Sequence, residues 1–318
     1  MSRGRWLLVP ALLLAVPVCL GAPLPEFAQV RSAHIRSDVQ LLDRHGQLLH
    51  ELRVNASVRR LAWVPITDIS PALVRSVVQA EDRRFFDHHG VDWTAIGAAA
   101  VRSLWSDNPR GASTLTMQLA GWINPDLRPD GGRRSLSQKW QQIQAARMLE
   151  EQWTKPEILE AYLNLVYFRG ELQGIDAAAR GLFDKQSSGL SEVEALVLAA
   201  LLRAPSATLD VVARRACHLG KDLDWSVLCP VIEATAREHL TGPFRVRAAA
   251  SDAPHVARAL LRRGTPRVVS TLDAGVQRFA QNALIHQLDT LSAERVRDGA
   301  VLVVDNRSGE VLAYVGNA

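Results

Sequence analysis

The sequence has few cysteines, and this scarcity excludes two classes of small protein. Three cysteines occur in 318 residues, too few for a disulfide-rich scaffold or for a zinc site built from four cysteines. Charge of one sign is also scarce, since 37 Lys and Arg face 33 Asp and Glu, a net charge of +4. So small and scattered an excess does not indicate nucleic acid as a partner. It does suit a protein that works beside anionic phosphate or an anionic membrane surface.

Long apolar runs are absent except near the N-terminus. Arg3 and Arg5 precede an apolar run of about 16 residues, short of the roughly 20 that span a bilayer ideally. A cleaved signal peptide and a short signal-anchor both fit. Cleavage after Ala22 would place Leu20 at the −3 position, a poor choice, so an uncleaved anchor over residues 1–24 is favoured. The arginines would stay cytoplasmic, which predicts a single-pass protein whose bulk lies on the outer side; in a bacterium this means the inner membrane, with the bulk in the periplasm.

Export would leave two cysteines free to pair. The spacing of Cys217 and Cys229 would close a short loop, as disulfides of exported proteins often do. A disulfide and two unpaired thiols both remain compatible with the sequence.

Helix signals dominate residues 70–205. Two loops with turn-forming residues interrupt them, at Ser106–Gly111 and Asn124–Gly132. Helix starts are indicated by a Ser-Pro pair and by two capping boxes: Ser70-Pro71, Thr154 with Glu157, and Ser191 with Glu194.

Strand signals lie towards the two ends of the chain. The patterns at 39–42 and 47–52 predict a β-hairpin around Arg44-His45-Gly46. Three further strands are predicted, with a turn at Asn306–Gly309 between the last two: 268–272, 300–305 and 310–315. The expected units are a membrane anchor, a hairpin linker, a helical domain, a second linker and the start of another domain: 1–24, 25–60, 61–210, 211–265 and 266–318.

Glu81 is the first candidate for chemistry. It falls on the apolar stripe of the helix that starts at Pro71, in line with Val77 and Val78. A carboxylate on an apolar face is costly unless it is paired or functional, and burial raises its pKa toward the range of a general base. The alternative is a salt bridge to a nearby arginine: Arg83, Arg84 or Arg102. The acids, aromatics and histidines that follow predict a helix end closed by Gly90, and they offer no metal-ligand spacing.

Two later segments are candidates for phosphate binding. Gly111 to Gln118 places hydroxyls at a helix start, where free N–H groups and the helix dipole favour an anion; plain N-capping by Ser113 is the alternative. In the next helix, around 134–150, Arg134 and Lys139 could reach a pyrophosphate, although a solvated face fits equally. One face of this helix carries Lys139, Gln142 and Ala146, and the other carries Leu136, Trp140 and Ile143.

In this order, these segments resemble glycosyltransferase family 51, the peptidoglycan polymerase domain of class A penicillin-binding proteins. The resemblance covers about residues 61–207, and its specificity comes from five short motifs in sequence: Glu81 to Gly90, Gly111 to Gln118, Lys139 to Glu150, Ile158 to Ala179, and Leu190 to Ser206. Within that class, Met117 and Gln142 resemble one subgroup.

The resemblance implies a mainly α, lysozyme-like glycosyltransferase domain that polymerises lipid II into glycan strands with inversion. Glu81 would be the general base. The implied substrate-binding residues are Asp82, His88, Gly111, Ser113, Thr114, Thr116, Gln118, Arg134, Lys139, Gln142 and Asn164. The implied partners are lipid II, the growing glycan strand, the inner membrane and other cell-wall synthases. No cofactor is required, although Mg²⁺ at the pyrophosphate fits the chemistry.

The sequence departs from the family pattern at two positions. Gln142 stands where most relatives carry a second glutamate, so we expect a site that depends on Glu81 and less on a divalent ion. Gly121 stands where many relatives carry a cation, for which Arg128 or Arg133 could substitute.

The segment from Ser270 to Gly316 resembles the entry to a transpeptidase domain. The Ser-x-x-Lys and Lys-Thr-Gly motifs of that domain do not occur here, so we expect this chain neither to cross-link peptides nor to react with penicillin. Two alternative functions remain: a lytic glycosidase of similar fold, and a lipid II-binding scaffold with little turnover.

Overall fold

The computed structural model describes residues 24–103, 113–127, 136–242, 244, 246–261 and 267–316. The expected membrane anchor therefore lies outside the described residues, apart from residue 24. In the described ranges, no helix combines the length and the apolar character needed to cross a bilayer.

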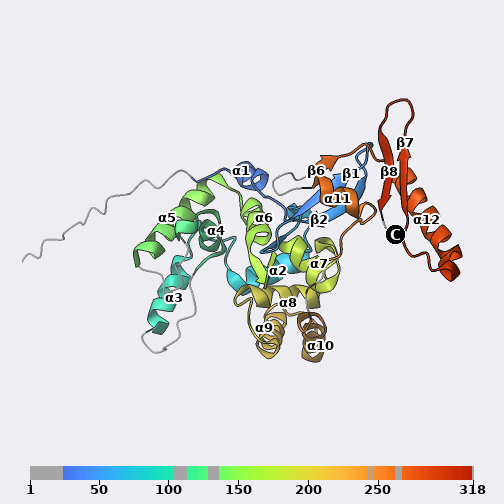
Figure 1. Cartoon of the computed structure of the whole chain (residues 1–318). Coiled ribbons are helices and arrows are strands. Elements are labelled where there is room, and N and C mark those ends of the chain that lie inside the picture. The colour runs from blue at the N-terminus through green and yellow to red at the C-terminus, as the bar shows by residue number, and fades with distance from the viewer. Residues whose placement is uncertain are drawn as a thin grey trace, which may run out of the picture.

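The centre of the molecule is a helical core, which confirms the prediction of a mainly helical domain. Helix α8 is buried along most of its length, and its apolar residues form the middle of the largest hydrophobic cluster. Helix α2 packs against it, residues of α4, α6 and α7 belong to the same cluster, and Figure 1 shows α3 and α5 beside α4 at one end of the molecule. The bounds are α1 Phe27–Ser32, α2 Pro71–Glu81, α3 Trp93–Ser103, α4 Leu115–Ile123, α5 Leu136–Gln152, α6 Lys155–Leu165, α7 Ile175–Phe183 and α8 Glu192–Leu202.

Two helices begin as their capping residues predict. Thr154 with Glu157 forms a capping box at α6, and Ser191 with Glu194 forms another at α8. At α2, Pro71 occupies the first turn as predicted, but Ser70 makes no capping bond. Its hydroxyl instead donates to the carbonyl of Leu190 at 2.9 Å, so Ser70 ties the start of α2 to the segment before α8.

The helical core continues beyond residue 210, so the expected linker over 211–265 is wrong for most of its length. Helices α9 (Leu209–Asp222) and α10 (Cys229–Leu240) pack against α8, and α11 (Pro254–Leu260) follows. The reason is an apolar stripe on α9 at helical spacing, whose members are buried in the main core: Val212, Ala213, Ala216 and Leu219. The structure joins Cys217 of α9 to Cys229 of α10 in a disulfide, with 5.2 Å between the Cα atoms.

The predicted hairpin is present as β1 (Asp38–Leu42) and β2 (Leu48–Arg53), which pair antiparallel. It is not an isolated linker, because β6 (Arg267–Val269) pairs parallel to β1 and makes the sheet β2-β1-β6. Residues of the hairpin pack with residues around α11 in a second apolar cluster. A second sheet, β3-β5-β4, lies against the helical core: β3 Arg59–Arg60, β5 Leu172–Gln173 and β4 Tyr167–Arg169.

The C-terminal elements form a helix packed on a hairpin. Strands β7 (Ala300–Val304) and β8 (Val311–Gly316) pair antiparallel around the predicted turn, where Gly309 has a φ of 73°. Helix α12 (Ala274–Thr290) covers one face of this pair through a small apolar cluster. Figure 1 shows this unit at the end of the molecule far from α3, α4 and α5.

Helix α2 ends at Glu81, so the prediction of a helix end closed by Gly90 is wrong. Residues 82–90 form turns, and Gly90 has a φ of 78°. A Cβ atom at Gly90 would lie 2.6 Å from the carbonyl oxygen of Ala146 in α5. Glycine is therefore required here by backbone conformation and by close packing.

Replacing this glycine should destabilise the fold. We expect Gly90→Ala to lower the free energy of unfolding by about 2–4 kcal/mol, because it adds left-handed strain and a backbone clash. Gly97→Ala is the matched control, since nothing lies within 4 Å of its Cβ position in α3, and it should be stabilising by up to about 1 kcal/mol. Urea unfolding of both variants measures the difference; equal stabilities would contradict the described packing.

Candidate active site

Glu81 is the last residue of α2, and its side chain is 9% exposed. The stripe it shares is confirmed, since Leu73 and Val77 are fully buried in the main core. One carboxylate oxygen, Oε2, accepts a hydrogen bond from Nε2 of Gln118 at 3.0 Å. The other, Oε1, is buried and has no hydrogen-bond partner among the described residues. The carboxylate thus has one hydrogen-bonded oxygen and one buried oxygen that receives no hydrogen bond.

The surroundings of Glu81 raise its pKa above the ordinary value. The main cause is burial, which disfavours the charged form; the hydrogen bond from Gln118 opposes it, as does the nearby charge of Arg203. Asp82 adds a smaller increase and Arg215 a smaller decrease. A buried carboxyl with a raised pKa is suited to general-base chemistry.

The alternative given for Glu81, a salt bridge to Arg83, Arg84 or Arg102, is not formed by the two of these arginines whose side chains are described. Arg83 pairs with Asp222 and Arg84 pairs with Asp92. Glu81 instead has Arg203 beside it, with 3.8 Å between Nε and Oε1. A cation at this distance helps to keep the carboxylate charged despite its burial.

Asp82 and His88 connect the end of α2 to the start of α4. Nε2 of His88 lies 3.0 Å from both oxygens of Asp82, and the backbone N–H of Leu115 donates to Asp82 Oδ2 at 3.0 Å. Both side chains are buried. The structure thus gives these two predicted substrate-binding side chains partners within the protein: each other, and for Asp82 also the first N–H of α4.

The hydroxyl groups at the start of α4 have different environments. Thr114 caps the helix, accepting from the N–H of Met117 and donating to the carbonyl of Gly90. Thr116 is fully buried, and its hydroxyl donates to Glu150 of α5. Ser113 is half-buried, and its Oγ accepts from Nζ of Lys139 at 2.6 Å. Of the three, Ser113 is the one placed beside a cation.

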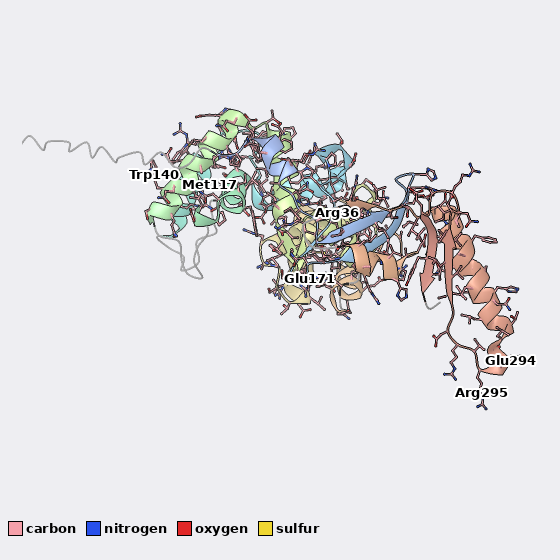
Figure 2. The ribbon with its side chains drawn as sticks, turned by 45° about the horizontal axis from the view of Figure 1, so that its top comes forward. Arg36, Met117, Trp140, Glu171, Glu294 and Arg295 are labelled. Carbon is pink, nitrogen blue, oxygen red and sulfur yellow. A yellow bond between two sulfur atoms is a disulfide. The ribbon has the colours of Figure 1, made fainter. Side chains whose placement is uncertain are left out.

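Helix α5 does not divide into a buried and an exposed side along the two predicted faces. Trp140 is 49% exposed, whereas Ile143, its expected partner on one face, is buried. Gln142 is only 1% exposed, and its Oε1 has no partner in the described part of the chain. In Figure 2, Trp140 and Met117 are labelled on the α5 and α4 end of the molecule. The neutral amide of Gln142 explains how this position is buried without a charged partner.

Asn164 lies inside the protein and is bonded to its backbone. Its Oδ1 accepts from the N–H of Val64 at 2.9 Å, and its Nδ2 donates to the carbonyls of Val64 and Glu160, each at 2.8 Å. The residue is 1% exposed. Both N–H donors of the side-chain amide are therefore used in contacts with the protein's own backbone. Gly111 and Arg134, with the possible substitutes Arg128 and Arg133, lie outside the described residues.

Two residues beside Glu81 were missed in the sequence. Arg203 stands within the fifth motif, and Tyr162 stands within the fourth. The hydroxyl of Tyr162 donates to Gln118 Oε1 at 3.1 Å. The sequence gives no sign of this contact, because Tyr162 has the spacing of an ordinary core aromatic. Arg203 was predictable as the residue that ends a helix, because it stands between the apolar last turn of α8 and Pro205.

Helix α4 brings the two halves of the site together. Glu81 contacts this helix at Gln118, and Lys139 contacts the residue before its cap, Ser113. Ser113 and Gln118 stand five positions apart in the sequence, so the carboxylate of Glu81 and the ammonium of Lys139 both contact residues around the start of α4. A base and a cation at one helix start suit a reaction in which a hydroxyl is deprotonated and an anionic group leaves. A cavity of about 440 Å³ lies elsewhere, near Arg53 and Glu171, both of which are paired with each other.

A family model described as Transglycosylase matches residues 45–222. The chain belongs to the transglycosylase family. The matched range contains every residue of the site described above, from Glu81 to Arg215.

Some relatives of this transglycosylase are matched over most of their own length, and others are much longer than the matched part. A biosynthetic peptidoglycan transglycosylase of Azoarcus sp. (strain BH72) is 37% identical over 204 residues, which are 63% of this chain and 85% of the relative. Penicillin-binding protein 1A of Escherichia coli (strain K12) is 31% identical over 280 residues, which are 82% of this chain but 32% of the relative. The chain likewise spans 39% of penicillin-binding protein 2D of Bacillus subtilis (strain 168).

A solved structure is also similar to this transglycosylase. The crystal structure of penicillin-binding protein 1A from Haemophilus influenzae matches 86% of this chain and 32% of that chain, with 17% identity and a TM-score of 0.32.

The raised pKa of Glu81 gives a test by stability. Because the folded state holds this pKa above its ordinary value of 4.5, ionisation of Glu81 disfavours folding, and this cost grows as the pH rises through the folded pKa. We expect Glu81→Gln to have a higher Tm than the wild type at pH 7, and the same Tm below about pH 4. The exposed Glu151→Gln is the control and should show no difference at either pH. A lower Tm for Glu81→Gln at pH 7 would show that the buried charge stabilises the fold.

Proposed function

We propose that this chain is a peptidoglycan glycosyltransferase that polymerises lipid II into glycan strands. The observation that supports the proposal most is the carboxylate of Glu81, buried within the matched transglycosylase range, whose Oε1 receives no hydrogen bond from the described residues. The printed name of the Azoarcus relative, a biosynthetic peptidoglycan transglycosylase, agrees with this activity.

The chemistry follows from the position of this oxygen. Glu81 Oε1 accepts the proton of the 4-hydroxyl on the acceptor sugar, and that oxygen attacks the anomeric carbon of the donor. The bond from the anomeric carbon to the lipid pyrophosphate breaks, its electron pair leaves with the pyrophosphate, and the configuration inverts. A sugar hydroxyl is a weak nucleophile, and a positioned base contributes typically about 10²–10⁴-fold.

The leaving pyrophosphate needs cations close to the start of α4. Lys139 with Ser113 is the described pair at that position, and it supplies a charge-assisted contact for a phosphate oxygen. We assign Asp82, His88, Thr114, Thr116 and Asn164 to the support of the site rather than to direct contact. Gly111 and Arg134 keep their proposed substrate-binding roles as sequence-based predictions.

The lipid-linked substrate is consistent with the N-terminal apolar run. We propose a single-pass protein of the inner membrane whose catalytic domain faces the periplasm, acting on lipid II and the growing strand beside other cell-wall synthases. Met117 and Gln142 support the finer assignment to the penicillin-binding protein 1C subgroup of the class A proteins. Peptide cross-linking is not part of the proposal, because its sequence motifs do not occur in these 318 residues.

A polymerisation assay tests the function directly. We expect the wild type to convert lipid II into longer glycan, and Glu81→Gln to lose activity by about 10²–10⁴-fold. Glu151→Gln, an exposed carboxylate on α5, should retain the wild-type rate. Purified glycan is the second substrate: shorter strands would identify a lytic glycosidase instead. Binding of lipid II with equal, negligible turnover in wild type and Glu81→Gln would identify a scaffold.

The proposed reaction depends little on a divalent ion. Among the described residues, no group of three His, Cys, Asp or Glu side chains is placed to hold a metal, and the buried Gln142 offers a neutral oxygen where a carboxylate would bind Mg²⁺ more strongly. The site residues thus fit a protein-held metal poorly.

Chelation tests this property of the site. We expect EDTA to reduce the polymerisation rate by less than about threefold, and Gln142→Glu to increase the response to added Mg²⁺ because it adds a carboxylate ligand. Rates with EDTA and with Mg²⁺ for both proteins give the comparison. A wild-type enzyme that is inactive in EDTA and restored by Mg²⁺ contradicts this expectation.

A further inference from the structure

A chain of two hydrogen bonds leads from the helical core to Glu81. The hydroxyl of Tyr162 on α6 donates to Oε1 of Gln118 on α4 at 3.1 Å. Nε2 of the same amide donates to Oε2 of Glu81 at the end of α2 at 3.0 Å. Three helices thus meet through one amide group, and neither the motifs nor the family match assigns a role to the tyrosine at its far end.

Tyr162 is the first donor in this series of two hydrogen bonds. It is fully buried, and burial, followed by the nearby charge of Glu81, raises the pKa of its phenol well above 10. The phenol therefore keeps its proton at any pH at which the protein works. A buried hydroxyl proton without an acceptor costs free energy, and the amide oxygen of Gln118 is the acceptor that the structure provides.

This donor fixes which way the amide of Gln118 faces. An amide has an acceptor at one end and donors at the other. With its oxygen bonded to the phenol, its NH₂ group faces Glu81. The reverse orientation would set the amide oxygen against the carboxylate and leave the phenol proton without an acceptor. The phenol thus favours the amide orientation that stabilises an ionised Glu81.

We propose that Tyr162 is a positioning residue that orients Gln118 and thereby keeps Glu81 ionised, with Oε1 available for the acceptor proton. The inference rests on the proposed function only for its catalytic consequence. The charged groups around Glu81 are Asp82 on the adjacent turn, Arg203 at the end of α8 and Arg215 on α9. None of them touches the amide in the described contacts, so the amide is a separate control on the same carboxylate.

The test compares Tyr162→Phe with a control, Tyr314→Phe. Tyr314 is a half-exposed residue of β8, far from the site, and its substitution also removes one hydroxyl. The titration of Glu81 is followed by carbon NMR of labelled glutamate, with Glu81→Gln for assignment, and kcat and KM for lipid II are measured against pH. In Tyr162→Phe we expect Glu81 to titrate at higher pH, because the amide no longer has a fixed orientation. The acidic limb of kcat should move with it. On that limb, kcat should fall by roughly 3- to 10-fold with KM nearly unchanged. Tyr314→Phe should match the wild type.

A second pair of variants separates this role from a loss of packing. Gln118→Met keeps the shape of the side chain and removes the amide, so adding Tyr162→Phe to it should produce no further shift in the titration of Glu81. If Tyr162→Phe does not fold, 3-fluorotyrosine at position 162 keeps the ring and makes the phenol a stronger donor, and Glu81 should then titrate at lower pH.

Three results would overturn the proposal: an unchanged titration of Glu81 in Tyr162→Phe, a shift that adds fully to that of Gln118→Met, or no downward shift with fluorotyrosine. A shifted titration in a protein that does not polymerise lipid II would retain the role of Tyr162 and refute the proposed function. The two failures are therefore distinguishable.

Discussion

The site depends on burying a carboxylate without neutralising it. Glu81 ends α2 on an apolar stripe, where loss of water disfavours its charge. The amide of Gln118 and the guanidinium of Arg203 counteract that cost. Since Gln118 belongs to α4 and Arg203 caps α8, the carboxylate is positioned by helices that the main core holds together. The arrangement explains how one acidic side chain remains both buried and able to accept a proton.

A group of contacts between the end of α2 and the start of α4 holds Glu81 in position. Asp82 receives bonds from His88 and from the first N–H of α4, while Gly90 allows the turn to approach α5 closely. These contacts set the end of α2 against the start of α4. Lys139 reaches Ser113 at that same start. A change in any of these supports should move base and cation relative to each other, which is how residues without substrate contact can still matter to the reaction.

Much of the fold was predictable from local signals, and the failures have physical reasons. The capping boxes at Thr154 and Ser191 fixed two helix starts, because each is a contact between residues three apart. The pairing of β6 with β1 left no such signal, since it joins segments more than 200 residues apart. The apolar stripe of α9 is present in the sequence at helical spacing, so this helix was predictable although a linker was expected. For the site, the stripe identified Glu81. Motif matching could not distinguish half-buried Ser113 from buried Thr116 and Asn164, because a motif does not report burial.

In the proposed reaction, Glu81 Oε1 takes the proton of the acceptor sugar. A structure of the protein bound to a lipid II analogue in the acceptor position would test this proton transfer. We expect the 4-hydroxyl oxygen within about 2.6–3.2 Å of Glu81 Oε1, with Gln118 still donating to Oε2. A 4-hydroxyl directed at a different acidic side chain, with Glu81 enclosed and out of reach, would contradict it.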